Sequence, residues 1–470
     1  MPSVTRGGFS SRIGFILAAA GSAVGLGNIW KFPYEAGKNG GAAFLVVYFL
    51  LTFLFCYPIM VGEIAIGRRA GKDVYGSYKL LGNKNWGLLG LLGILCGIMI
   101  LSFYNVVAGW AFGYFLEISF GNLLSEPDYG KFFGNYVNDF WDNLLFSLGF
   151  MAITAYIVAK GVKQGIEAAS KIMMPALLLI LLLLIGYSLT LPNAMKGISF
   201  YLLPDFSKIT LDTIYPAMGH AFFSLSLGMG ALITYGSYVE KKQNIMSAAF
   251  TITIMDMSVA FLAGLMIFPL IFSQGVAPDS GPSLVFVVLP SIFKAFGPVL
   301  GKVVGGSFFL LLCFAALTST ISLLEVPVAY FVDEKNVSRQ KVTWLIAAVI
   351  FIVGLPSMLS QGVVPAFNKL HFYHDKTALD FVAEVFSELC LPLGGCLMCL
   401  FIVLRWGQHN MSKEIYEGNP GYEGSFLEKY INFTMRYVCP ILLGIFSILI
   451  VLDKLFSVTL DDLTGLLGVR

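Results

Sequence analysis

Charged residues are scarce in this chain, and their scarcity excludes an ordinary soluble fold. Only 12% of its 470 residues are Asp, Glu, Lys or Arg, while 57% are hydrophobic and the mean hydropathy is +0.79. Soluble domains carry roughly 25% charged residues, so this composition is typical of a polytopic membrane protein. The formal net charge is +2 and the basic residues are spread over the loops, which argues against a nucleic-acid partner.

Histidine is also rare, which leaves little material for an enzyme's metal cluster or nucleophile–base pair. His220 stands alone in an apolar segment, and the other three histidines lie in loops or near span ends: His371, His374 and His409. The seven cysteines lie in or beside apolar segments and are interpreted as packing residues. Cys396 and Cys399 have a spacing found in metal and redox sites, but no His or Cys cluster joins them.

Apolar runs predict eleven membrane spans in an all-α protein. A cleavable signal peptide is not expected, because Arg12 leads directly into a full-length span without a small-residue cleavage site. The tail, 454–470, is too short and too charged to form a twelfth span. The expected spans lie near 11–35, 41–67, 88–120, 143–161, 170–191, 213–239, 245–273, 297–331, 342–359, 380–404 and 434–453.

Basic residues gather in alternate short loops, from Arg6 and Arg12 at the start of the chain to Arg339 and Lys341. The loops between them carry more acidic residues, such as Asp205. By the positive-inside rule the N-terminus is cytoplasmic, and an odd number of spans then places the C-terminus outside. We expect a multi-pass protein of the cell membrane, with the lipid bilayer as its surroundings.

Two spans are interrupted by glycine. The first carries three glycines between Gly21 and Asn28, and the sixth is broken between Ser224 and Gly230. Glycine disfavours helix interiors, and backbone groups freed within the membrane need a partner. Breaks at matching places in two five-span halves predict a 5+5 inverted repeat with a binding site at the repeat interface.

One transporter domain, 1–470, is therefore expected. Its parts are a cytoplasmic N-terminal segment, two five-helix repeats, an eleventh helix and a short extracellular tail: 1–10, 11–191, 213–404, 434–453 and 454–470.

Several polar residues lie inside the expected spans, where each needs a reason. Glu63 is either an acceptor for amides freed by the breaks or a side chain that reaches the interface. Asp256 is either a ligand for a cation or a protonated packing residue. The hydroxyls of Thr318, Ser319 and Thr320 bond to the preceding turn or ligate a cation.

Four segments together resemble the neurotransmitter:sodium symporter family, and most closely its bacterial amino-acid transporters. The resemblance covers nearly the whole chain and implies the LeuT fold with two sodium sites. The matching segments are GSAVGLGNIWKFPY from Gly21 to Tyr34, Ser102–Tyr104, Phe222–Gly228 and Ala315–Ser319.

The resemblance also implies ligands and a substrate pocket. The first sodium is expected at Ala23, Asn28, Ser224 and Asp256, and the second at Gly21, Val24, Ala315, Thr318 and Ser319. The expected substrate residues are Ser22, Ala23, Leu26, Gly27, Ile100, Tyr104, Phe223, Ser224, Ser226, Met229, Ser319 and Leu323.

The apolar wall of that pocket favours a hydrophobic L-amino acid, and the flexible Met229 favours a bulky or aromatic one. Asp256 replaces the family's neutral Asn, and Ala260 stands where Ser or Glu is found. Because Asp256 supplies the negative charge itself, we expect no chloride requirement. His220 stands in place of a usual Gln, either as a neutral hydrogen-bonding substitute, which is favoured, or as a pH-sensitive group.

The resemblance implies gates at both ends of the path. At the outer gate Lys31 replaces the usual Arg and Ala383 the usual Asp, so Asp380 or Glu384 is the expected partner of Lys31. The cytoplasmic gate is expected to contain an ion pair with two aromatic neighbours: Arg6, Asp333, Phe9 and Tyr238. The family's Gly-x9-Pro pattern, at Gly165 and Pro175, implies a segment able to unwind.

The sequence thus predicts a sodium-coupled symporter that imports hydrophobic or aromatic L-amino acids by alternating access. Carriers of another small zwitterion or amine, such as glycine, a GABA-like compound or an osmolyte, remain alternatives, and a proton-coupled transporter is less favoured. The spans hold too few polar residues to line an ion channel.

Overall fold

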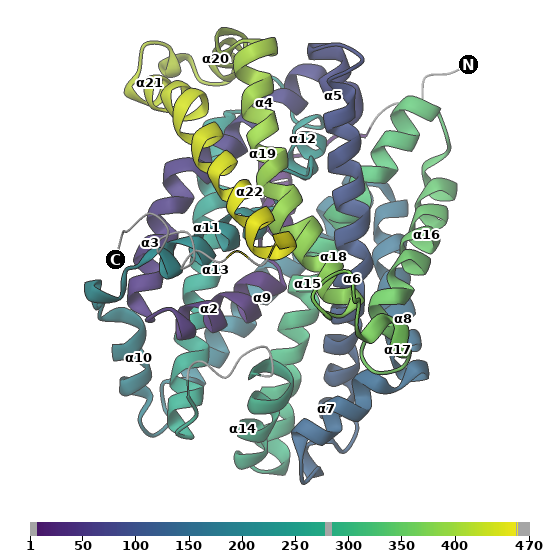
Figure 1. Cartoon of the computed structure of the whole chain (residues 1–470), viewed down its shortest axis with the longest axis vertical. Coiled ribbons are helices and arrows are strands. Elements are labelled where there is room, and N and C mark those ends of the chain that lie inside the picture. The colour runs from purple at the N-terminus through teal and green to yellow at the C-terminus, as the bar shows by residue number, and fades with distance from the viewer. Residues whose placement is uncertain (1–6, 278–283, 457, 459–470) are drawn as a thin grey trace.

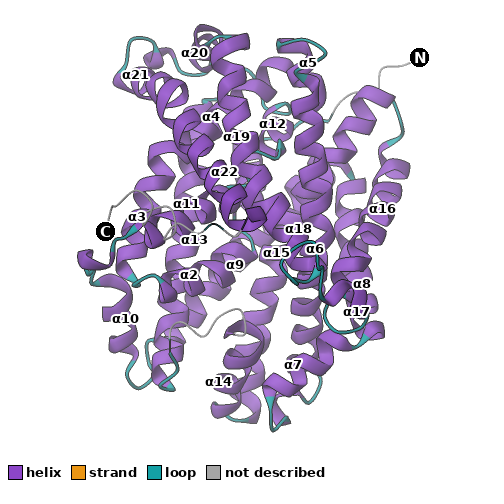
Figure 2. Ribbon diagram, viewed as in Figure 1, coloured by secondary structure: helices purple, strands orange, loops and turns teal. Residues whose placement is uncertain are grey.

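The computed structural model describes residues 7–277, 284–456 and 458 (Figure 1). Across these residues the secondary structure is helical, apart from loops and one isolated antiparallel bridge between Leu370 and Lys376 (Figure 2). The all-α expectation is confirmed. The predicted gate residue Arg6 and almost all of the predicted tail lie outside the described residues.

Nine helices in the described residues are long and apolar enough to cross a membrane. A tenth span is a bent pair, Arg12–Ala23 (α1) and Gly27–Lys38, with 52° between its halves. The nine are Ala42–Ala70, Gly87–Ser119 (α6), Phe140–Ala159 (α8), Val162–Ser188, Ile245–Ser273 (α13), Pro298–Lys335 (α15), Arg339–Leu359 (α16), Ala378–Trp406 and Phe426–Lys454.

The expected sixth span consists of two helices, Leu211–Ser224 (α11) and Ala231–Gly236 (α12), with six irregular residues between them. Other spans are subdivided by π-helical turns into α2 (Phe32–Lys38), α3 (Ala42–Leu51), α4 (Tyr57–Ala70), α9 (Ala168–Ser188), α18 (Ala378–Ala383), α19 (Cys390–Phe401), α21 (Phe426–Phe433) and α22 (Cys439–Phe456).

Short helices cover the two ends of the bundle. Figure 1 shows α5 and α20 at one end and α7, α10 and α14 at the other. α5 begins where the Asp73 carboxylate accepts hydrogen bonds from the amides of Tyr75 and Gly76, which is a normal N-cap. The short helices are α5 (Val74–Leu81), α7 (Tyr129–Asn138), α10 (Ala194–Leu202), α14 (Leu289–Ala295), α17 (Pro365–Asn368) and α20 (Gln408–Glu417).

The two longest helices, α6 and α15, pack along each other at the centre of the molecule. A Cβ atom on Gly97 of α6 would lie 3.5 Å from the Leu323 carbonyl of α15, so the two backbones approach closely there. α15 also packs against α1 and α9. This arrangement places the break in the first span against the middle of α15.

The two breaks differ in backbone conformation, and only the second has glycines at positive φ. α1 ends at Val24, which is extended, and Gly228 and Gly230 have positive φ angles of 84° and 79°. A Cβ atom on Gly228 would overlap the Leu391 carbonyl, so α19 packs directly against the second break.

Two spans begin earlier than their hydropathy predicts. The fifth starts at Val162, not near 170, with a π-helical turn, and the eleventh starts at Phe426, not near 434. The early turn of the fifth span carries polar residues that lower its hydropathy. Its Glu167 is nevertheless buried, because Ser10 and Lys171 satisfy the carboxylate at 2.7 and 2.6 Å.

Candidate functional site

A small pocket lies between the two helix breaks. None of its described lining residues is charged. They are Ser22, Ala23, Gly25, Gly27, Asn28, Ile100, Tyr104, Phe223, Ser224, Ser226, Met229, Ser319, Leu323 and Leu391.

Every expected substrate residue except Leu26 lines this pocket. Leu26 instead lines a neighbouring cavity, which shares Gly27, Tyr104 and Phe223 with the pocket and is also lined by Lys31. We call this second cavity the vestibule. Sequence reasoning missed Leu391, because only the folded chain shows that α19 closes against the break.

Polar groups of the first span are exposed toward the pocket. The Leu26 amide donates to the Tyr104 hydroxyl at 2.9 Å, which leaves that hydroxyl's own hydrogen to donate to a ligand. The Ser226 hydroxyl donates to the Ser22 carbonyl at 2.8 Å, and this bond joins the two breaks. The pocket therefore offers a donor at one side and carbonyl or hydroxyl acceptors at another.

Three of the four residues expected at the first sodium site form one buried cluster. The Asp256 Oδ1 atom accepts hydrogen bonds from Asn28 at 2.7 Å and from the Ser224 hydroxyl at 2.8 Å. Tyr48 donates to the other carboxylate oxygen at 3.0 Å. The fourth residue, Ala23, lines the adjoining pocket. The carboxylate and hydroxyl oxygens suit a hard cation, whereas Asn28 presents its NH2 group to Asp256 and its amide oxygen accepts from the Gly25 amide at 2.9 Å.

The residues expected at the second sodium site join α1 to α15. The Thr318 hydroxyl lies 3.3 Å from the Val24 carbonyl across the helix interface and 3.0 Å from the Ala315 carbonyl in its own helix. The Ser319 hydroxyl lies 3.3 Å from the same Ala315 carbonyl. Gly21 faces Thr318, because a Cβ atom there would lie 3.1 Å from the Thr318 Cβ. The hydroxyls of Thr318 and Ser319 thus bond to the preceding turn of their own helix, and their ligation of a cation stays a prediction.

Glu63 supports the second break. Its side chain is buried, and its Oε1 atom accepts a hydrogen bond of 2.7 Å from the Gly228 amide. The alternative, a side chain that reaches the interface, is wrong. Burial of a carboxylate is tolerated here because the freed amide of the break needs an acceptor.

His220 does not act as the hydrogen-bonding substitute that the sequence favoured. Its imidazole is buried, and neither ring nitrogen has a hydrogen-bond partner among the described residues. The ring packs between Phe32 and Tyr48, at centroid distances of 5.4 and 5.5 Å.

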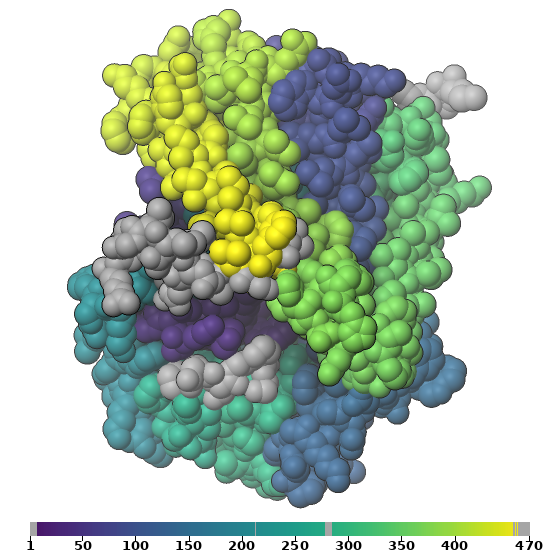
Figure 3. Space-filling view, viewed as in Figure 1, coloured from purple at the N-terminus to yellow at the C-terminus, as the bar shows by residue number. Residues whose placement is uncertain are grey.

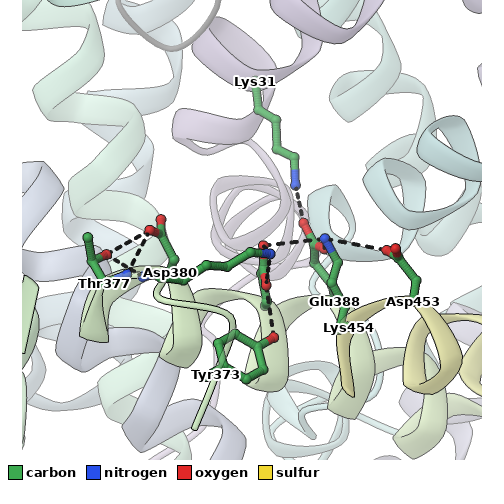
Figure 4. Close-up of polar contacts among 9 residues, drawn as sticks. Lys31, Tyr373, Thr377, Asp380, Glu388, Asp453 and Lys454 are labelled. Carbon is green, nitrogen blue, oxygen red and sulfur yellow. Dashed lines mark hydrogen bonds and ion pairs between the residues drawn. The ribbon is translucent and has the colours of Figure 1, made fainter. Parts of the chain in front are cut away.

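At the expected outer gate, Lys31 pairs with Glu388 at 3.3 Å, and the expected partners Asp380 and Glu384 are wrong (Figure 4). The Asp380 carboxylate accepts from Thr377 at 2.7 Å in the N-terminal cap of α18. Glu384 is held at 2.7 Å by Lys376. A π-helical turn, Glu384–Leu389, follows α18 and changes which residues face the first span.

At the expected cytoplasmic gate, the two expected aromatic residues lie together with an acid that sequence reasoning missed. Phe9 packs edge-on against Tyr238, with ring centroids 6.1 Å apart. Tyr238 donates to Glu325 at 2.7 Å, and Glu325 also pairs with Arg339. A lone acid within the apolar eighth span was the available signal for Glu325.

Asp333, the expected acidic gate residue, accepts a hydrogen bond of 2.9 Å from the Asp73 amide. Burial, together with the nearby charges of Asp333 and Glu334, raises the pKa of the Asp73 carboxyl to about 6, against the opposing effect of the hydrogen bonds of the cap. The start of α5 is thus fixed to the C-terminal end of α15.

Gly165 and Pro175 both lie in helical segments of the fifth span. A Cβ atom on Gly165 would overlap the Ile157 carbonyl of α8, so this glycine permits close packing. Pro175 removes one hydrogen bond from within α9. Their ability to unwind remains a prediction.

Cys396 and Cys399 pack between α19 and the eleventh span, as expected. The Cys396 thiol lies 3.4 Å from the Pro440 carbonyl, and the Cys399 sulfur lies 3.9 Å from the sulfur of Met435. Among the described residues, no group of three or more His, Cys, Asp or Glu could hold a metal ion.

Two broken helices that face each other across an uncharged pocket, beside buried carboxylate and hydroxyl oxygens, define a secondary membrane transporter. The family model of the sodium:neurotransmitter symporter family matches residues 6–128 and 141–460, and the chain belongs to that family.

Relatives and a solved structure agree. The chain is 39% identical over 436 residues to the sodium-dependent transporter YhdH of Bacillus subtilis, covering 92% of this chain and 95% of that protein. It is 33% identical over 455 residues to a sodium-dependent transporter of Haemophilus influenzae, covering 93% and 96%. The crystal structure of MhsT in complex with L-phenylalanine superimposes with a TM-score of 0.86 at 43% identity, covering 94% of this chain and 99% of that one.

These findings confirm the LeuT fold and identify a sodium-dependent membrane transporter with a small-molecule substrate. The relatives are transporters and not enzymes, so the chain is a transporter as well.

Proposed function

We propose that this protein is a symporter that couples the entry of two sodium ions to the import of a hydrophobic or aromatic L-amino acid. The observation that carries the proposal is the uncharged pocket between the breaks, which adjoins the Asn28, Ser224 and Asp256 cluster. MhsT, which has the same fold at 43% identity, binds L-phenylalanine.

The substrate's ends match the two sides of the pocket. The Tyr104 hydroxyl and the amides of the first break suit a carboxylate, while carbonyls and hydroxyls at the ends of α1 and α11 suit an ammonium group. The remaining wall is apolar and excludes a charged side chain. Its members are Ile100, Phe223, Met229, Leu323 and Leu391.

Coupling follows from shared residues. Ser224 belongs both to the oxygen cluster around Asp256 and to the pocket lining, so the first sodium would lie beside the substrate carboxylate. The second sodium would hold α1 to α15 through Val24 and Thr318. Loss of that ion to the cytoplasm would let the N-terminal half of the first span move away from α15.

Chloride is not required in this proposal. Asp256 is fully buried and contributes a carboxylate at the position where the first sodium needs a counter-charge. We further propose a cytoplasmic N-terminus and an outer C-terminus, which the distribution of Lys and Arg supports.

Uptake into proteoliposomes tests the proposal. The panel contains radiolabelled phenylalanine, tyrosine, tryptophan, leucine, alanine, glycine and GABA, each measured with and without an inward sodium gradient, and with chloride or gluconate. We expect sodium-driven uptake that favours the aromatic substrates and is equal in the two anions. Preference for glycine or GABA, or uptake without sodium, would overturn the proposal.

A further inference from the structure

Glu388 of the outer gate lies between two lysines that come from opposite ends of the chain. Its Oε1 atom is 3.3 Å from the ammonium group of Lys31, and its Oε2 atom is 3.6 Å from that of Lys454. Figure 4 shows Glu388 between these two residues, with Asp453 beside Lys454. The resemblance to the symporter family gave no reason to expect a residue of the eleventh span at this gate.

The fold brings the second lysine there. Lys454 lies in the last turn of α22, and α22 packs against both α19 and the π-helical turn Glu384–Leu389 that carries Glu388. In the space-filling view, atoms from the start of the chain (purple) lie recessed between α22 (yellow) and the teal segments below it (Figure 3).

Lys31 and Glu388 both line the vestibule above the substrate pocket. The Lys31 ammonium group also lies 5.7 Å from the centre of the Phe223 ring, which belongs to vestibule and pocket alike. A substrate in the vestibule therefore lies beside the Lys31–Glu388 pair before it reaches the pocket. Each of the two side chains is 36% exposed, so the pair is partly shielded from water.

We propose that Lys454 is a positioning residue of the outer gate, which keeps Glu388 neutralised when Lys31 moves away. Separation of a partly buried ion pair leaves a carboxylate that has lost its partner, and this loss opposes opening. A second ammonium group on the other carboxylate oxygen reduces that loss. Removal of Lys454 therefore favours the closed gate.

Lys454 has a second carboxylate neighbour, Glu384, which lies nearer to it than Glu388 does but has further partners of its own. Glu384 lies 3.3 Å from Lys454 but is held more closely by Lys376, at 2.7 Å, and by the Tyr373 hydroxyl, at 2.8 Å. Asp453 lies 3.7 Å away and is 39% exposed. Lys376 offers a matched control. Its removal takes a lysine away from the neighbouring Glu384 and leaves both ion pairs of Glu388 in place.

The inference rests on the proposed function, and the wild-type protein separates the two. If wild-type proteoliposomes show no sodium-driven uptake, the proposed function fails. If they do, the rate of exchange of internal phenylalanine for external labelled phenylalanine is measured in Lys454→Gln, Lys454→Arg and Lys376→Gln. Sodium-dependent phenylalanine binding in detergent reports whether each variant is folded.

We expect Lys454→Gln to slow exchange about three- to fivefold, as for loss of a partly exposed ion pair, with phenylalanine affinity unchanged or tighter. Lys454→Arg and Lys376→Gln should exchange at the wild-type rate. In a Glu388→Gln background, Lys454→Gln should have no further effect, because there is no carboxylate left to neutralise.

Equal exchange in wild type and Lys454→Gln overturns the inference. So does an equal slowing by Lys454→Gln with and without Glu388→Gln. Lys454→Met is a second variant without the charge. If Lys454→Gln and Lys454→Met both fail to bind phenylalanine, and Lys454→Arg does not exchange at the wild-type rate, then Lys454 is a structural residue and the inference is overturned as well.

Discussion

At position 25 the lack of a side chain leaves room beside the first break. A Cβ atom on Gly25 would lie 2.6 Å from the Ser319 hydroxyl and 2.8 Å from the Tyr104 hydroxyl. These are groups that we propose hold the substrate. Glycine here is required by the pocket, and not only by the backbone.

We therefore expect Gly25→Ala to weaken phenylalanine binding. Overpacking costs about 1–3 kcal/mol, which corresponds to roughly a five- to hundredfold increase in Kd. Binding of labelled phenylalanine to purified protein measures it. Gly186→Ala is the control, because a Cβ atom on Gly186 meets nothing within 4 Å. Wild-type affinity in Gly25→Ala would contradict the assigned pocket.

A substitution at a single residue, Asp256, tests the proposal that transport does not require chloride. Asp256→Asn keeps an acceptor for Asn28 and Ser224 but removes the charge, which at 4 Å and a dielectric constant of 20 is worth about 4 kcal/mol to a bound sodium. We expect chloride-free uptake to fall by at least about tenfold, which needs only about 1.4 kcal/mol of that interaction, and to recover partly in chloride. Asp205→Asn, on an exposed loop, is the control. Unchanged uptake in gluconate would refute the role of Asp256.

At the scale of elements, the π-helical turns decide which residues face the site. Asp380, Glu384 and Glu388 are spaced by four residues, which in a regular helix would keep them near one face. The turn Glu384–Leu389 is wider than an α-helical turn and rotates the residues after it about the helix axis. A four-residue spacing alone therefore cannot identify which acid reaches Lys31.

The break in the sixth span depends on a side chain from another element. The Glu63 carboxylate of α4 accepts from the Gly228 amide, which the break leaves without a helical partner. We expect Glu63→Ala to cost about 1–3 kcal/mol and to lower the apparent Tm of the purified protein, because a buried donor loses its acceptor.

Glu63→Gln is the matched variant, since its side-chain carbonyl still accepts from Gly228, and its Tm should fall less. The apparent Tm of each variant, measured as the temperature at which phenylalanine binding is lost, distinguishes Glu63→Ala from Glu63→Gln. If Glu63→Ala melted at the wild-type temperature, the carboxylate would not support the break.

At the scale of the whole molecule, local pattern predicted much of the outcome. Hydropathy located the spans, and clusters of glycine located both breaks, because each is a property of neighbouring residues. Contacts between residues far apart in the sequence were harder to predict. The Glu325–Arg339 pair, Leu391 at the pocket and Glu388 beside Lys31 all depend on helix register, which no local pattern fixes.

The two proposed sodium sites would also set the thermodynamics of the whole transport cycle. With 100 mV negative inside and a tenfold sodium gradient, each ion contributes about 2.3 plus 1.4 kcal/mol, so two give on the order of 7 kcal/mol for a neutral amino acid. That supports roughly a 10⁵-fold accumulation, whereas one ion supports only a few hundredfold. Uptake should therefore move two charges per substrate.

Accumulation of labelled phenylalanine at potentials set by potassium and valinomycin measures this charge. The logarithm of the accumulation ratio should change with potential at the slope for two charges. Thr318→Val keeps the shape of the side chain but removes the hydroxyl that contacts Val24 and Ala315, so it should lose uptake or show the slope for one charge. A wild-type slope of one charge would leave the second oxygen cluster as a packing contact between α1 and α15, and would limit coupling to the ion that touches the substrate.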